Sequence, residues 1–175
     1  LESGEAPFDY HLCMAVTTGT SEGVQYALAQ IKAGAVREGR IQQGGRTVRL
    51  VLLDQNSNGR FDDAISIRST GMQLSLQEGD LLLVNPNIRS RALAATASVD
   101  RHFVSRTVCI GRHFYKMEIT PSGDRLSLEP VEPAVGHVTN AGPLYRATVY
   151  SDDYGVLLIS GQGDQKIPLL QGEWK

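Results

Sequence analysis

The stretch Thr47-Val48-Arg49-Leu50-Val51-Leu52-Leu53 runs directly into Asp54-Gln55-Asn56-Ser57-Asn58-Gly59-Arg60-Phe61-Asp62-Asp63. Its first part is apolar, partly β-branched, and has the length of a strand. Before it, residues 35–41 are joined to Arg46 by Gln42-Gln43-Gly44-Gly45. Two glycines between such runs indicate a two-residue hairpin turn. The region therefore predicts a hairpin whose second strand leads into an acidic loop.

Short alternating runs separated by turn residues continue along the chain. Eighteen glycines and seven prolines interrupt the 175 residues, and apolar alternation recurs in 64–68, 71–76, 113–120 and 126–130. Residues 8–14 predict a short strand closed by a turn cluster at 17–23. Residues 24–33 fit a helix or a strand, and Gly23 and Gly34 at their ends favour the strand. We predict an all-β fold, an antiparallel meander or sandwich of short strands, and no βαβ nucleotide-binding fold.

Residues 88–101 have the weakest pattern, with arginines scattered among alanines and serines. They are the expected boundary between two similar β halves, residues 1–90 with the 54–63 loop and residues 91–175. One continuous domain is the alternative, because 175 residues also suit a single core.

The composition limits the kinds of partner that we expect this chain to bind. The chain is 41% hydrophobic and 21% charged with a net charge of −2, which argues against the clustered Lys and Arg of a nucleic-acid-binding surface. The longest strongly apolar runs, 50–53 and 81–84, are far shorter than the roughly 20 residues of a membrane-spanning helix. We therefore expect neither a nucleic-acid partner nor a membrane span. A protein or glycan partner stays open.

The 54–63 loop has the layout of a calcium loop, in which oxygen ligands recur at every second residue and a glycine at position six allows a sharp turn. Its twelfth position holds Ile65 in place of the bidentate Glu of an EF-hand, so Asp63 or Asp80 would have to complete the site. The candidate metal ligands are Asp54, Asn56, Asn58, the carbonyl group of Arg60, Asp62 and Asp63. The predicted cofactor is a weakly bound Ca²⁺.

Two resemblances follow from these residues. Up to Asp62 the loop resembles the EF-hand-like calcium loops of dockerins and thrombospondin type 3 repeats. The wider stretch from Val48 to Asp63, with a turn such as Ser122-Gly123-Asp124 before an alternating strand, resembles uncharacterised secreted bacterial β-domain proteins that carry a D-x-N-x-N-G-x-F-D-D hairpin. The second resemblance implies an extracytoplasmic location (secreted, periplasmic or cell surface) and no particular activity.

A turn without metal explains the same residues. Asn58-Gly59 between two apolar runs is a strong hairpin signal, and Asn and Asp also hydrogen-bond their own backbone in turns. Both interpretations of the loop remain open from the sequence.

The other reactive residues form no recognisable motif. Cys13 and Cys109 are either a disulfide pair or two buried thiols that act as small hydrophobic residues. The four histidines lie in different segments without metal-ligand spacing, and Gly-x-Ser-x-Gly and P-loop motifs are absent. We therefore expect a non-enzymatic, extracytoplasmic β-domain, calcium-braced, in surface structure, adhesion or ligand binding. The alternative is a hydrolase or carbohydrate-active module whose site is assembled from dispersed loops.

Overall fold

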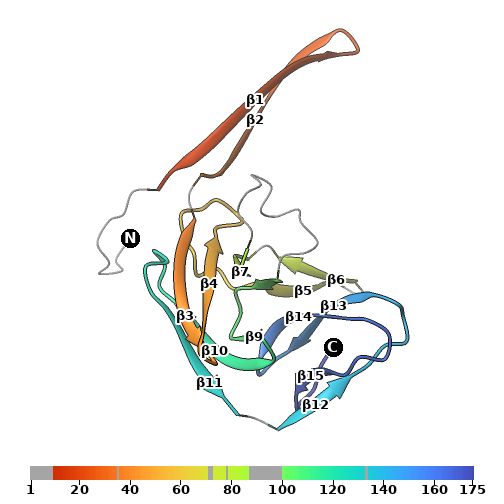
Figure 1. Cartoon of the computed structure of the whole chain (residues 1–175). Coiled ribbons are helices and arrows are strands. Elements are labelled where there is room, and N and C mark those ends of the chain that lie inside the picture. The colour runs from red at the N-terminus through yellow and green to blue at the C-terminus, as the bar shows by residue number, and fades with distance from the viewer. Residues whose placement is uncertain (1–9, 35, 71–72, 78, 87–99, 133) are drawn as a thin grey trace.

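The structure, a computed structural model, describes residues 10–34, 36–70, 73–77, 79–86, 100–132 and 134–175. Within these ranges it contains strands β1 to β15 and no helix. The described residues therefore include no helix that is long and apolar enough to cross a membrane. The strands pair antiparallel in small sheets of two to four strands. The all-β prediction is confirmed (Figure 1).

The four-stranded sheet has the order β3-β4-β7-β8 and contains the predicted hairpin. Its strands are β3 (Arg37–Gln43), β4 (Arg46–Leu53), β7 (Leu81–Val84) and β8 (Asp100–Phe103). Gly44 and Gly45 connect β3 to β4 with φ values of 55° and 76°, the left-handed conformation that a tight hairpin turn requires of both central residues. β4 and β7 lie at the centre of the sheet, and residues 50–52 of β4 and all four residues of β7 are almost fully buried.

A three-stranded sheet shares its core with the first. It consists of β9 (Thr107–Ile110), β10 (His113–Ile119) and β11 (Leu126–Val131) in the order β11-β10-β9. The common core is formed by Val48, Leu50, Leu52, Phe61, Leu82, Val84, Val104, Val108, Ile110 and Met117. These residues come from both sides of the expected boundary at residue 90, and β8 pairs with β7 across it. Residues 88–99 of the expected boundary segment lie outside the described residues.

The C-terminal part adds two strand pairs, of which one is a hairpin and the other joins the two ends of the segment. β12 (Val135–Val138) pairs with β15 (Ile167–Leu170), and β13 (Tyr145–Ser151) pairs with β14 (Gly155–Gly161). A second core cluster of Phe114, Leu157, Ile159, Leu169 and Leu170 joins these strands to β10. Trp174 stacks on Tyr154 with ring centroids 5.8 Å apart, which fixes the chain after β15 to the turn after β13.

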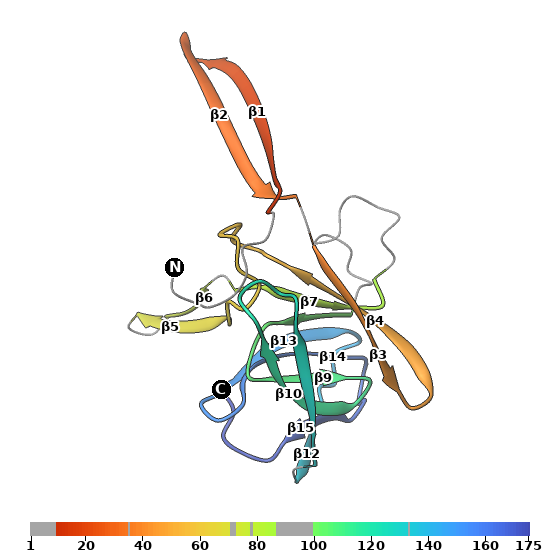
Figure 2. The ribbon, with the colours of Figure 1, turned by 90° about the vertical axis from the view of Figure 1, so that its left-hand side faces the viewer.

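A long hairpin of β1 (Leu12–Ser21) and β2 (Val24–Ala33) projects away from the sheets (Figures 1 and 2). The prediction of a strand for 24–33 is confirmed. The prediction that 17–23 forms a turn was wrong for Thr17 to Ser21, which continue β1 because threonine suits strands and each residue finds a partner in β2. Only Glu22 and Gly23, both with positive φ, make the turn. A smaller hairpin, β5 (Ser66–Thr70) with β6 (Gln73–Gln77), follows the 54–63 loop.

Candidate metal site

Two buried carboxylates meet at one end of the four-stranded sheet. Leu53, the last residue of β4, pairs with Leu81, the first of β7. Asp54 follows β4 and Asp80 precedes β7, so the antiparallel pairing brings both to the same end of the sheet. Asp54 is 4% exposed and Asp80 is fully buried. Two adjacent buried acids at a strand end are costly without polar partners, so their partners define the site.

Asp54 organises the backbone of the loop. Its Oδ1 accepts a hydrogen bond from the Ser57 amide at 2.6 Å, and its Oδ2 accepts one from the Gly59 amide at 2.8 Å. Ser57 and Gly59 have φ values of 60° and 87°, so the loop turns sharply where these two amides point inward. The first loop residue thus occupies the position from which an ion-binding loop is usually anchored.

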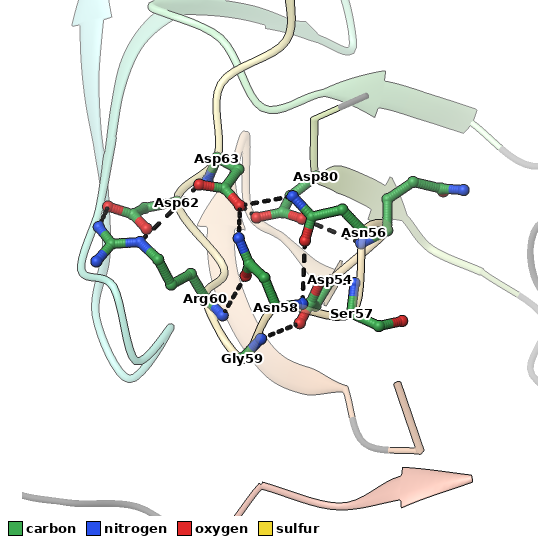
Figure 3. A network of polar contacts seen from close by, with 10 residues as sticks. Asp54, Asn56, Ser57, Asn58, Gly59, Arg60, Asp62, Asp63 and Asp80 are labelled. Carbon is green, nitrogen blue, oxygen red and sulfur yellow. Dashed lines mark hydrogen bonds and ion pairs between the residues drawn. The ribbon is translucent and has the colours of Figure 1, made fainter. Parts of the chain in front are cut away.

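Asn56, Asn58 and Asp63 form the exposed side of the cluster (Figure 3). The side-chain amides of Asn56 and Asn58 donate to Asp63 Oδ2 at 2.8 and 2.5 Å. Each asparagine Oδ1 accepts a backbone N–H two residues further along, Asn58 N at 3.1 Å and Arg60 N at 2.8 Å. Three side chains predicted as ligands therefore converge on one another.

Asp80 closes the cluster from the neighbouring strand. Its Oδ1 accepts from Gln55 N at 3.0 Å and its Oδ2 from Asp63 N at 2.9 Å, so it ties the two ends of the loop together. Burial raises the pKa of Asp80 to about 7; the charges of Asp63 and Asp54 act in the same direction, and the two backbone hydrogen bonds oppose them. Burial, more than the neighbouring charges, therefore favours a proton on Asp80.

Asp62 pairs with Arg60 at the edge of this cluster, where Arg60 also lies 3.9 Å from Asp63 Oδ1. Arg60 Nη2 binds Asp62 Oδ2 at 2.7 Å, and Asp62 Oδ1 is buried without a hydrogen-bond partner. In Figure 3 their paired side chains lie to one side of Asp63. Of the candidate ligands, Asp54, Asn56, Asn58 and Asp63 are thus brought together with Asp80, whereas the Asp62 side chain pairs with Arg60.

The loop is bonded to the root of the projecting hairpin. Tyr10, two residues before β1, donates its hydroxyl to Asp54 Oδ2, and the amide of Ala33, the last residue of β2, donates to Ser57 Oγ at 2.8 Å. Burial, followed by the bond to Asp54, raises the pKa of the Tyr10 hydroxyl, which therefore stays a donor. The sequence contained no signal for these partners, because Tyr10 lies 44 residues from Asp54 and Ser57 is an ordinary turn residue.

The oxygen atoms of the cluster are of the type that binds a hard cation, but its carboxylates alone do not form a metal site. Among the described residues, no three or more Asp, Glu, His or Cys side chains are arranged to hold a metal ion by themselves. Asn56 and Asn58 present their NH₂ groups to Asp63, while their oxygens accept backbone N–H groups, so a half-turn of each amide toward an ion would break both kinds of hydrogen bond. The candidate set is Asp54, Asp63 and Asp80 with the two amide oxygens, which are oxygen ligands that Ca²⁺ accepts, and binding would require these side chains to move from their present positions.

Elsewhere in the described ranges, the reactive side chains form no second cluster of this kind. Cys13 is exposed and Cys109 is half-buried, and both are free thiols in the described structure. A comparison with protein families, with curated proteins and with solved structures found no match to this chain. Its function is therefore argued from the loop and the elements around it.

Proposed function

We propose that this chain is a non-enzymatic, extracytoplasmic β-domain of surface structure, adhesion or ligand binding, in which Ca²⁺ bound at the 54–63 loop braces the root of the β1–β2 hairpin. The observation that carries the proposal is the position of the loop. It lies between the end of β4, the start of β7 and both sides of the hairpin root. An ion there would join three segments that are far apart in the sequence.

Charge supports a cation at this position. Burial raises the pKa of Asp80, and the charges of Asp63 and Asp54 add to this effect. A divalent cation would relieve this repulsion and replace the proton that burial otherwise favours on Asp80. Ca²⁺ suits the irregular mixture of carboxylate and amide oxygens better than Mg²⁺, which keeps several waters and demands octahedral geometry.

The expected affinity is that of an extracellular module. Two of the five ligands are neutral amides, and Arg60 places a positive charge 3.9 Å from Asp63 Oδ1. Both features weaken the binding of a cation, so we expect a Kd of roughly 10⁻⁴ to 10⁻³ M. Such a site is filled at the millimolar calcium of an extracytoplasmic space, in agreement with the location that the sequence resemblance implies.

A catalytic role for the cluster is less well supported. A carboxyl group with a pKa near 7 suits acid–base catalysis. However, Asp80 is fully buried, and each of its oxygens already accepts a backbone N–H. These contacts hold the loop together, and burial keeps the carboxyl group out of reach of an organic substrate. They favour a structural role over a hydrolase.

Hydrogen exchange at the hairpin root tests the bracing role. With calcium at about ten times Kd, amides that open together with the loop, including Ala33 N, should exchange about tenfold more slowly than in EDTA. The amides at the hairpin turn should not change. Ser57→Ala is the matched control, because it removes the acceptor of Ala33 N without removing a candidate ligand. It should abolish the effect at Ala33 and retain calcium protection at Gly59.

Protection confined to the loop in the unmodified chain would show that calcium binds without bracing the hairpin. Identical exchange in calcium and EDTA throughout the loop would contradict the whole proposal.

A further inference from the structure

The β1–β2 hairpin exposes apolar side chains on a ribbon that carries very little charge. Between Leu12 and Ala33 the charged residues are Glu22, in the turn, and Lys32, near the root. Met14 is 67% exposed, and Leu12, Val16 and Ile31 are each more than half exposed. Figures 1 and 2 show the ribbon standing clear of the sheets from two directions. A two-stranded ribbon is marginally stable in water by itself, so packing against a second layer would stabilise this hairpin.

The register divides the ribbon into two different faces, because directly paired residues of antiparallel strands share a face. One face, here called the neutral face, carries no charge. It consists of the pairs Leu12–Ala33, Met14–Ile31, Val16–Ala29, Thr18–Ala27 and Thr20–Gln25. The opposite face carries Lys32, and there the Tyr26 ring already covers Gly19, where an added Cβ would lie 2.6 Å from the tyrosine hydroxyl.

We propose that the neutral face binds the neutral face of a second copy of this chain across a twofold axis through the Val16–Ala29 pair, perpendicular to the strands. The two ribbons then run antiparallel, with their sheets at opposite ends. In this arrangement Met14 of one copy lies over Thr18 of the other, and Ile31 lies over Ala27. Large side chains near the root thus cover small ones near the turn, so the face is complementary to itself.

The size and chemistry of the face favour a second copy over lipid. A ten-residue strand is about 33 Å long, and stacking two such ribbons removes on the order of 1,000 Å² of accessible surface, near the lower limit of a specific interface. The dimer should therefore be of micromolar strength. Thr18, Thr20 and Gln25 occupy the outer half of the same face. In hydrocarbon all these polar groups would lack partners, whereas in the dimer Thr20 and Gln25, at the end of the face, stay at a hydrated rim and Thr18 is covered by Met14 of the other copy.

Sedimentation equilibrium from roughly 1 μM to 1 mM tests the proposal, since this range brackets a micromolar Kd. The unmodified chain should pass from monomer to dimer. The double substitution Met14→Lys with Ile31→Lys places like charges in the interface and should weaken association at least about 100-fold. The matched control, Ala15→Lys with Gln30→Lys, alters the adjacent cross-strand pair on the opposite face and should leave the dimer unchanged. Thermal melts in parallel establish that both variants keep the folded sheets.

Three results would overturn the proposal. One is a monomer over the whole range, and another is equal weakening by the two double variants. The third is an unmodified monomer that floats with neutral phosphatidylcholine vesicles, which would assign the neutral face to lipid. Running each sample in EDTA and in calcium separates this proposal from the metal site. A dimer that forms equally in both would stand even if the loop bound no ion.

Discussion

Replacing Phe61 with alanine should lower the free energy of unfolding by about 3–5 kcal/mol. Phe61 lies within the 54–63 loop, but its ring is 1% exposed and belongs to the main core. The Tyr10 ring packs at its edge with centroids 6.2 Å apart, and the Arg37 guanidinium lies 5.3 Å from its centre. Removal of the ring leaves a cavity that these neighbours cannot fill, and it loosens the segment that holds the loop on the sheet.

For a chain of this size the loss corresponds to a Tm lower by roughly 6–20 °C. A thermal melt in EDTA measures it without any contribution from a bound ion. Tyr26→Ala is the control, because it also removes an aromatic ring but at a site that is 51% exposed on the projecting hairpin. A Phe61→Ala melt within about 2 °C of the unmodified protein would show that the loop does not depend on this anchor.

In EDTA, Asp80 should make a contribution to stability that grows as the pH falls from about 7 to about 4. It is opposed by Glu38 and Asp124, whose pKa values are lowered by hydrogen bonds from Arg49 and Thr120. Burial raises the pKa of the Asp80 carboxyl group to about 7 in the folded state, whereas an unfolded Asp titrates near 3.9. Between these values the folded state binds a proton that the unfolded state does not. The Asp80 contribution is therefore greatest below the unfolded pKa and is lost as the pH rises through 7. A shift of this size corresponds to on the order of 4 kcal/mol.

Urea unfolding at several pH values measures this slope. Asp80→Asn is the control, because it cannot titrate and should remove the Asp80 contribution to the slope, whatever constant destabilisation it adds through the two backbone amides that Asp80 accepts. Calcium should reduce the slope in the unmodified protein by favouring the charged carboxylate. Equal slopes in the two proteins would show that Asp80 is already charged in the folded state.

Local signals in the sequence predicted much of the fold. The Gly44-Gly45 turn and the apolar run of β4 depend on residues next to one another, so their patterns specify the hairpin. The convergence of Asp54, Asn56, Asn58 and Asp63 follows in the same way from one short loop. These are the parts of the candidate site that a sequence motif can contain.

The remaining parts depend on contacts between distant segments. Asp80 contacts the loop because β7 pairs with β4, and Tyr10 contacts it because Tyr10 lies beside the same end of the sheet. The sequence also did not predict that the β1–β2 hairpin projects away from the sheets (Figures 1 and 2). Val16 and Ile31 have the apolar alternation of half-buried strands, yet no other element in the described part of the chain covers them. Alternation predicts a strand but does not specify what packs against it.

A thermal melt with and without calcium is the most direct test of the metal site. Calcium at about 10 mM, roughly ten times a Kd near 1 mM, adds about 1.4 kcal/mol of stability and should raise the Tm by about 3–6 °C over EDTA. Magnesium at the same concentration should raise it less. Asp54→Ala should abolish the calcium effect, because it removes the residue that anchors the loop. An unmodified protein that melts at the same temperature in calcium and in EDTA, or an Asp54→Ala variant that keeps the full calcium shift, would contradict a calcium site at the 54–63 loop.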